Sequence, residues 1–160
     1  MTAETTAETR WLTAEEQCIW RTFLAMTKQL NSALARQMQA ESDLSIADFE
    51  VLVALTDTPD GTVRCAELAR CLAWEKSRLS HHITRMQKRG LVDKRACPTD
   101  GRGALVVITD RGRRAIEQAA PRHVETVRRL VFDKLTEDEL TQLRTISARI
   151  LEGLDGELPE

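Results

Sequence analysis

Residues 64–92 read RCAELARCLAWEKSRLSHHITRMQKRGLV and contain the clearest structural pattern of the chain. Its apolar side chains recur at the three- and four-residue spacing that predicts helices, one over 64–72 and one over 75–89. Only residues 73–74 separate the two, and Gly90 suits the position just past a helix end, where a positive φ is required. The expected inner faces carry Leu68, Leu72, Leu79, Ile83 and Met86. Two short helices joined by a tight turn predict a helix-turn-helix.

The segment after this helix pair has the pattern of a β-hairpin. We expect strands over 91–95 and 105–108, the second of which is rich in β-branched residues. The connection, 96–103, has Asp-Gly near its centre and is longer than a minimal turn, so we expect it to project. A hairpin behind a helix-turn-helix makes residues 45–114 a winged helix-turn-helix lobe.

Further amphipathic helices surround this core. We expect them over 12–39, 45–57, 109–132 and 136–154. Their starts carry capping residues, namely Thr13 with Glu16, Ser45 with Asp48, Thr109, and Thr136 with Glu139. The sequence therefore predicts a single domain, 1–160, that is mainly α with a small β-hairpin wing. Residues 12–40 and 115–155 lie outside the winged lobe.

Charge is distributed unevenly along the chain. The formal net charge is −2, but residues 64–114 hold 13 Lys and Arg against 5 Asp and Glu, a net charge of +8. The rest of the chain carries −10. A basic segment within an acidic scaffold is typical of a module that binds DNA, whose phosphates attract cations.

The helix over 75–89 carries the residues that we expect to contact DNA. If its apolar stripe faces the core, its polar side chains lie on the other faces, namely Lys76, Ser77, Arg78, Ser80, His81, His82 and Arg85. Residues near the start of such a helix reach base edges, so we assign Arg78 and His81 to bases, with Ser77 or His82 as further candidates. Lys76, Ser80 and Arg85 are expected to contact the DNA backbone. The alternative is an ordinary solvated basic face.

The hairpin tip carries a second candidate contact. Arg102 is a lone arginine on an expected projecting loop, and such a side chain can enter the minor groove, where the potential is negative. Asp100 lies two residues away and can brace it. The alternative is a surface salt bridge of little energetic value.

Several of these stretches together resemble the MarR family of transcriptional regulators. The residues that carry the resemblance are Cys65–Ala69 (CAELA), Leu79–Met86 (LSHHITRM), Lys88–Val92 (KRGLV), Asp100–Arg102 (DGR) and Ile108–Arg113 (ITDRGR). They correspond to the family's first helix-turn-helix element, recognition helix, helix exit, Asp-x-Arg wing motif and the helix start after the wing. The similarity extends over nearly the whole chain.

The resemblance implies a homodimer in which helices from 12–40 and 115–155 form the interface. It also implies binding to pseudo-palindromic double-stranded DNA and repression that is relieved by a small ligand or an oxidant. A cysteine-based redox sensor or a zinc-responsive regulator of the same fold is the alternative.

The sequence gives no indication of catalysis or of a cofactor. It contains no nucleophile elbow, phosphate loop, HExxH pattern or catalytic carboxylate pair, so we expect no enzymatic activity. The four cysteines, Cys18, Cys65, Cys71 and Cys97, do not have zinc-binding spacing. The adjacent His81 and His82 point about 100° apart on a helix, and with His123 they form no ligand set. We therefore expect no metal.

Two cysteines remain candidates for oxidation. Cys18 lies in the first helix, roughly where oxidant-sensing relatives keep their thiol, although its neighbours do not favour the reactive thiolate. Cys97 lies in the expected wing loop, where we expect it to be exposed and easily alkylated.

A small aromatic ligand is a further expected partner. Trp11, Trp20, Trp74, Phe23, Phe49 and Met26 could line a pocket for it. Core packing is the alternative for each of these side chains.

The polar start of the chain lacks the features of a signal peptide, and no apolar run reaches the ~20 residues that cross a bilayer. We expect a cytoplasmic protein.

Overall fold

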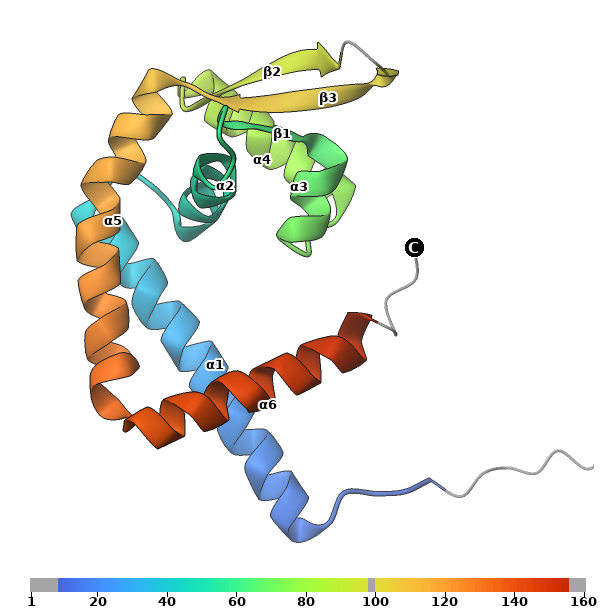
Figure 1. Ribbon diagram of the computed structural model, residues 1–160, viewed down its shortest axis with the longest axis vertical. Helices are drawn as coiled ribbons and strands as arrows, with labels where there is room; N and C mark the ends of the chain where they lie inside the picture. The colour runs from blue at the N-terminus through green and yellow to red at the C-terminus, as the bar shows by residue number, and fades with distance from the viewer. Residues whose placement is uncertain (1–8, 98–99, 156–160) are drawn as a thin grey trace, which may run out of the picture. The chain divides into compact units, whose positions relative to one another are not determined.

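The computed structural model describes residues 9–97 and 100–155, without the side chains of 100–102 and 155. The helices are α1 (Ala14–Glu41), α2 (Ile46–Thr56), α3 (Cys65–Cys71), α4 (Lys76–Lys88), α5 (Asp110–Leu130), the 3-10 helix η1 (Phe132–Lys134) and α6 (Glu137–Asp155). The strands are β1 (Thr62–Arg64), β2 (Val92–Cys97) and β3 (Asp100–Ile108) (Figure 1). The fold is mainly helical with one small antiparallel sheet, as expected.

The chain divides into two compact units after Ala33. Among the described residues, the first unit is the N-terminal part of α1 with the short segment before it. The second unit, Leu34–Glu160, contains the end of α1 and all the other helices and strands.

The helices begin where the capping residues predict. Thr13 and Glu16 bond each other's backbone N–H, as do Ser45 with Asp48 and Thr136 with Glu139. The Thr109 hydroxyl accepts a bond from the Gly112 N–H at 3.0 Å. These bonds satisfy backbone donors that the first turn of a helix leaves free.

Gly90 ends α4 in the way its sequence position predicts. Its φ is +72°. The Gly90 N–H bonds the Gln87 carbonyl at 2.9 Å, and the Leu91 N–H bonds the Met86 carbonyl at 3.0 Å. This pair of bonds is the Schellman motif, which requires a left-handed residue after the helix. The turn sends the chain directly into β2.

The sheet differs from the expected two-stranded hairpin in two respects. It has three strands in the order β1-β3-β2, and β1, which pairs Val63 with Val106, was not expected. The hairpin strands are also longer than predicted, because β2 continues to Cys97 and β3 begins at Asp100. The predicted loop over 96–103 is therefore wrong at both ends. Its middle, residues 98–99, lies outside the described residues.

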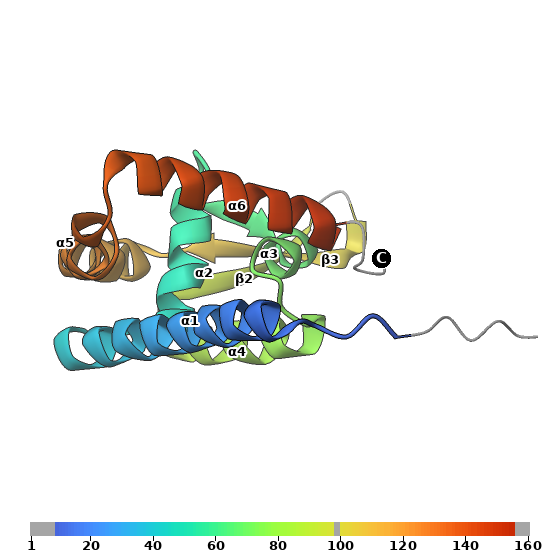
Figure 2. The ribbon, with the colours of Figure 1, turned by 90° about the horizontal axis from the view of Figure 1, so that it is seen from below.

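One hydrophobic core joins α2, α3 and α4 to the sheet. Figures 1 and 2 show these three helices gathered on the same side of the strands. The side chains that are completely buried are Met38, Val51, Leu52, Leu55, Leu68, Ile83, Met86, Val92 and Val106. Leu79 is only 2% exposed, so the predicted inner face of α4 is confirmed.

The junction between the sheet and α5 is closely packed around Gly112. The Thr109 hydroxyl bonds the Gly90 and Leu91 carbonyls at 2.6 and 3.0 Å. A Cβ atom added at Gly112 would collide with the Leu91 carbonyl oxygen. Only glycine allows the first turn of α5 to approach the chain leaving α4 so closely, which fixes the end of α4 against α5.

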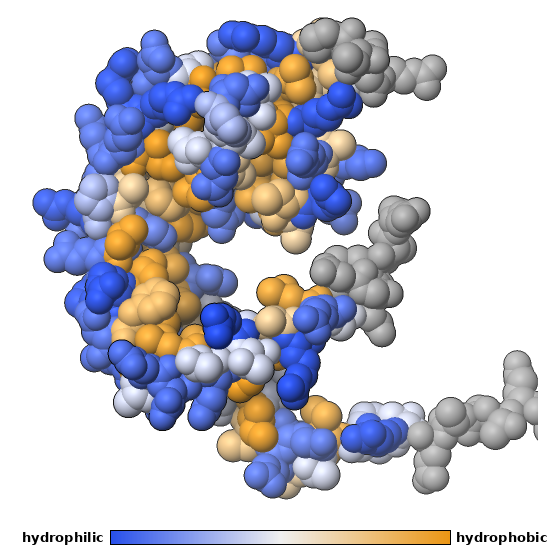
Figure 3. Space-filling model, in the orientation of Figure 1, coloured by the Kyte–Doolittle hydropathy of each residue, from blue (hydrophilic) through white to orange (hydrophobic). Residues whose placement is uncertain are grey.

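The long helices leave many apolar side chains exposed. In the second unit these are Val124, Phe132, Leu143, Ile146, Ile150, Leu151 and Leu154, and in the first unit Trp11, Leu12, Ile19, Trp20, Phe23, Leu24 and Met26. Figure 3 shows apolar areas, in orange, at the surface along α5. No helix within 9–97 and 100–155 combines the length and the apolar content needed to span a membrane.

Candidate nucleic-acid interface

The outer surface of α4 is polar and cationic. Six of the seven residues that we assigned to it are exposed, namely Lys76, Ser77, Arg78, Ser80, His81 and Arg85. They share a helix whose opposite stripe is fully buried, so their directions are fixed by the packing of Leu79, Ile83 and Met86. A helix held in this way presents donors and cations on one side, which is what base edges and phosphates require.

His82 is the exception, and the prediction that it lies on an outer face is wrong. The residue is only 7% exposed. Its spacing from Leu79 and Met86, three residues before it and four after it, places it on the inner stripe. The sequence pattern therefore contained this information, although the polarity of histidine favoured an outward assignment.

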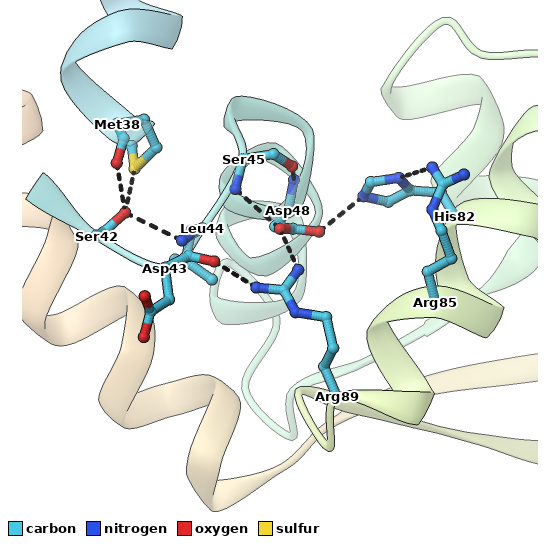
Figure 4. Close-up of polar contacts among 9 residues, drawn as sticks. All are labelled: Met38, Ser42, Asp43, Leu44, Ser45, Asp48, His82, Arg85 and Arg89. Atoms are coloured by element: carbon cyan, nitrogen blue, oxygen red, sulfur yellow. Dashed lines mark hydrogen bonds and ion pairs between the residues drawn. The ribbon is translucent and has the colours of Figure 1, made fainter. Parts of the chain in front are cut away.

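The burial of His82 is explained by Asp48 of α2. His82 Nε2 lies 3.0 Å from Asp48 Oδ1, and the Arg89 guanidinium, just past α4, lies 2.6 Å from Oδ2 (Figure 4). Asp48 also accepts the Ser45 N–H at 2.9 Å through its capping bond. Arg89 makes a second bond to the Asp43 carbonyl. One carboxylate thus joins the start of α2 to the middle and the end of α4.

The environment of Asp48 keeps it ionised. Burial by itself would raise the pKa of its carboxyl group. The contacts with His82, the Ser45 N–H and Arg89 outweigh burial and hold this pKa well below its usual range. Asp48 therefore carries a negative charge at neutral pH, and contacts with its protein partners stabilise this charge in place of water.

Two arginines on the outer side of α4 each contact a ring of a neighbouring side chain. The Arg85 guanidinium lies 2.9 Å from His82 Nδ1. The Arg78 guanidinium lies 4.3 Å from the centre of the Trp74 ring, within the range of a cation–π contact. Trp74 in turn packs edge-on against His82, with ring centres 5.3 Å apart. The sequence did not indicate this role for Trp74.

The turn before α4 has an unusual backbone that places Trp74. Ala73 has a φ of +51°, a left-handed conformation that residues with a side chain rarely adopt. The Trp74 N–H bonds the Ala69 carbonyl at 2.8 Å, which folds the turn back onto α3. Through this turn the indole lies under the first turn of α4, where Arg78 can stack on it.

The candidate contacts of the wing belong to β3. Asp100 and Arg102 are both in this strand, but their side chains lie outside the described part. Their roles at the minor groove stay predictions.

One cysteine is not placed as expected. Cys97 is only 6% exposed, so the prediction of an accessible wing thiol is wrong. Its position in β2 rather than in a loop explains the burial. Cys18 and Cys71 are exposed, and burial raises the pKa of the half-buried Cys65 despite the nearby Lys94. The described residues bring together no group of three His, Cys, Asp or Glu side chains that could hold a metal.

A cavity of about 600 Å³ lies beside Arg89 in the second unit. It is lined by Gln39, Ala40, Glu41, Ser42, Asp43, Leu44, Arg89, Leu91, Arg111, Arg114, Ala115, Gln118 and Ala119. Its lining is mainly polar and includes none of the aromatic residues that we expected to line a pocket. Phe49 instead packs against His123, with ring centres 4.5 Å apart, and Trp74 packs against His82.

The helix pair, the three-stranded sheet and the cationic outer face of α4 define a winged helix-turn-helix DNA-binding protein. Comparison with known proteins gives the family. A sequence model of the MarR family matches residues 42–103. AbsC from Streptomyces coelicolor, a MarR family transcriptional regulator, is 40% identical, with a TM-score of 0.88 over 92% of this chain and 99% of that chain.

Two further relatives agree. Sco3205 from Streptomyces coelicolor, a MarR family transcriptional regulator solved in complex with DNA, is 38% identical, with a TM-score of 0.89 over 93% of each chain. The multiple antibiotic resistance protein MarR of Salmonella typhimurium is 25% identical over 79% of this chain and 86% of its own. The chain belongs to the MarR family. It is a DNA-binding transcriptional regulator and not an enzyme.

Proposed function

We propose that this regulator is a homodimeric repressor that binds pseudo-palindromic promoter DNA and is released by a small ligand or an oxidant. The observation that carries the proposal is the cationic face of α4, whose Arg78 and Arg85 project from a rigidly packed helix. The exposed residues from Lys76 to Arg85 are its major-groove contacts, and Asp100 with Arg102 are its wing contacts.

A dimer is supported by the apolar side chains that α6 leaves exposed. Leu143, Ile146, Ile150 and Leu154 recur at helical spacing and are 40–56% exposed. Burying such a stripe against a second copy would gain hydrophobic free energy. We assign the interface to residues 12–40 and 115–155. A two-fold dimer would then place its two α4 helices in successive major grooves, about 34 Å apart.

Binding to the upstream DNA of its own gene tests the DNA contact. Fluorescence anisotropy should show sequence-selective binding whose affinity falls steeply with salt, because bound phosphates release counterions. Arg78→Ala should weaken it by roughly tenfold or more, the scale of one lost base contact per subunit. Arg10→Ala, an exposed arginine before α1 that lies outside the basic segment and outside both interface ranges, is the matched control and should leave affinity unchanged. Equal effects of both variants would reject the assignment.

Release by a ligand is supported by the cavity beside Arg89. Its wall carries three arginines, Arg89, Arg111 and Arg114, and two carboxylates, those of Glu41 and Asp43. This small excess of positive charge favours an anionic compound such as an aromatic carboxylate. A ligand weakens DNA binding only if it binds the DNA-free state more tightly. In the proposed mechanism it stabilises a separation of the two α4 helices that does not match the DNA.

Screening separates ligand release from oxidation. A thermal-shift screen of phenols and aromatic carboxylates should find a compound that raises the Tm and weakens DNA binding. Arg114→Ala should reduce both effects. Weakening by hydrogen peroxide that Cys18→Ser abolishes would instead assign the signal to oxidation. If neither class of compound changes DNA affinity, the release mechanism is wrong.

A further inference from the structure

We propose that His82 is a positioning residue for DNA binding. It links the buried Asp48 carboxylate to the exposed Arg85 guanidinium and so holds Arg85 in place on the DNA-facing side of α4. The inference rests on the proposed function, because Arg85 must contact DNA for its position to matter.

The geometry fixes which imidazole nitrogen carries the proton. An arginine guanidinium can only donate hydrogen bonds. The Arg85 Nη2 that lies 2.9 Å from His82 Nδ1 therefore requires Nδ1 to be the unprotonated acceptor. The proton is then on Nε2, which faces the Asp48 carboxylate at 3.0 Å. In this tautomer the imidazole lies between the Asp48 carboxylate, which is close to Nε2, and the Arg85 guanidinium, which donates to Nδ1.

The imidazole itself has little freedom to move. Asp48 holds one edge of the ring, and Trp74 packs edge-on against it at 5.3 Å. Asp48 is in turn fixed by the Ser45 N–H and by Arg89. A carboxylate that orients one ring nitrogen also strengthens the other as an acceptor, as it does for metal-binding and catalytic histidines. Figure 4 shows the resulting chain from Asp48 through His82 to Arg85.

The benefit for DNA binding is preorganisation. Arginine has a long flexible side chain, and a free one loses rotamer entropy when it contacts a phosphate. Ordering it before binding removes roughly a two- to twelvefold penalty in affinity for each side chain. Only one of its five N–H groups is engaged by His82 Nδ1, so the others remain available for DNA. With two subunits bound, the combined effect is roughly four- to 140-fold.

Two substitutions separate the contact of His82 with Asp48 from its contact with Arg85. In His82→Gln the side-chain amide can still donate to Asp48, but nothing replaces Nδ1 as the acceptor for Arg85. In His82→Asn the amide oxygen takes the place of Nδ1 and can accept from Arg85, while the donor to Asp48 is lost. If His82 only stabilised the fold, His82→Asn would be more damaging than His82→Gln, both to stability and to DNA binding.

The positioning role predicts the opposite order for DNA affinity. His82→Gln should weaken binding to the upstream DNA by roughly fivefold or more, and His82→Asn should recover most of this loss despite a lower Tm. In an Arg85→Ala background, His82→Gln should have no further effect. Glu50→Gln, which changes an exposed side chain of α2 outside the interface ranges and outside the DNA-facing residues, is the control and should bind as the wild type does.

A measurement without DNA keeps the two proposals distinct. Nitrogen-15 NMR of the free protein should show His82 as a neutral ring protonated at Nε2, with the Nδ1 resonance shifted by Arg85→Ala. A ring protonated at Nδ1, or additive effects of His82→Gln and Arg85→Ala, would overturn the positioning role while leaving the repressor proposal intact. If the wild type binds no upstream DNA, both proposals fail.

Discussion

Asp48→Asn should destabilise the winged lobe, because Asp48 joins α2 to α4. Asparagine has nearly the same shape as aspartate and can still accept the Ser45 N–H, so the cap of α2 is retained. The negative charge is lost, and the Arg89 guanidinium, now 2.6 Å from a neutral amide, loses its ionic partner. The change therefore removes the negative charge of one buried carboxylate, and it also turns an amide NH2 group toward His82 Nε2, where Asp48 presents an oxygen.

The magnitude follows from the burial of the two partners. Breaking a buried ion pair costs about 3–5 kcal/mol of unfolding free energy. The Asp48 side chain is 3% exposed but that of Arg89 is 41% exposed, so solvent screens part of the attraction. We therefore expect a loss of about 2–3 kcal/mol. For a chain of this length that corresponds to a Tm lower by roughly 4–12 °C.

The pH dependence gives an independent signature. Because the pKa of Asp48 is lowered in the folded state from its usual 3.8, its contribution is complete above that value and is lost as pH falls below it. Burial lowers the pKa of His123 from 6.5. Stability is therefore also lost as pH falls below 6.5, because the unfolded chain takes up this proton more readily. This loss occurs at a higher pH than that of Asp48 and is common to both proteins. The wild type should therefore approach the stability of Asp48→Asn only below about pH 4.

Thermal and urea unfolding from pH 7 to pH 2.5 make the measurement. Asp43→Asn is the matched control, because Arg89 bonds the backbone carbonyl of Asp43 and not its exposed carboxylate. It should change stability by less than about 0.5 kcal/mol. Equal unfolding curves for Asp48→Asn and the wild type at pH 7, or parallel losses of stability below pH 4, would show that the charge of Asp48 does not stabilise the lobe.

Two further predictions concern packing. Gly112→Ala places a Cβ against a backbone carbonyl and should cost about 3 kcal/mol in urea unfolding, the upper part of the range for overpacking. Gly153→Ala, in α6 with nothing within 4 Å of the new atom, should instead be neutral or stabilise by up to about 1 kcal/mol; equal destabilisation by both would show that the tight junction is not the cause. Brief iodoacetamide treatment of the native protein, followed by mass spectrometry, should modify the exposed Cys71 and leave Cys97 unmodified, and rapid modification of Cys97 would contradict its burial in β2.

Local signals predicted much of the fold. Hydrophobic spacing was sufficient for the inner face of α4, and capping residues located the starts of four helices within one residue or two. These features depend on residues close in sequence, so no tertiary information was needed. The same spacing also included His82, and the misassignment came from giving its polarity more weight than its position.

Long-range partners account for what the sequence could not predict. The carboxylate of Asp48 was recognised as part of a cap, but its pairing with Arg89 joins residues 41 positions apart. Strand β1 has only three residues, too few for a periodic pattern, and exists because β3 offers it a partner. The extension of β2 to Cys97 likewise depends on pairing across the hairpin, which turned an expected loop thiol into a buried one.

Methylation-protection footprinting on the upstream DNA shows whether two copies of α4 contact DNA together. We expect two protected major-groove patches on one side of the duplex, about 34 Å apart, which both disappear with Arg78→Ala. A single protected half-site, or a footprint that Arg78→Ala leaves unchanged, would contradict this expectation.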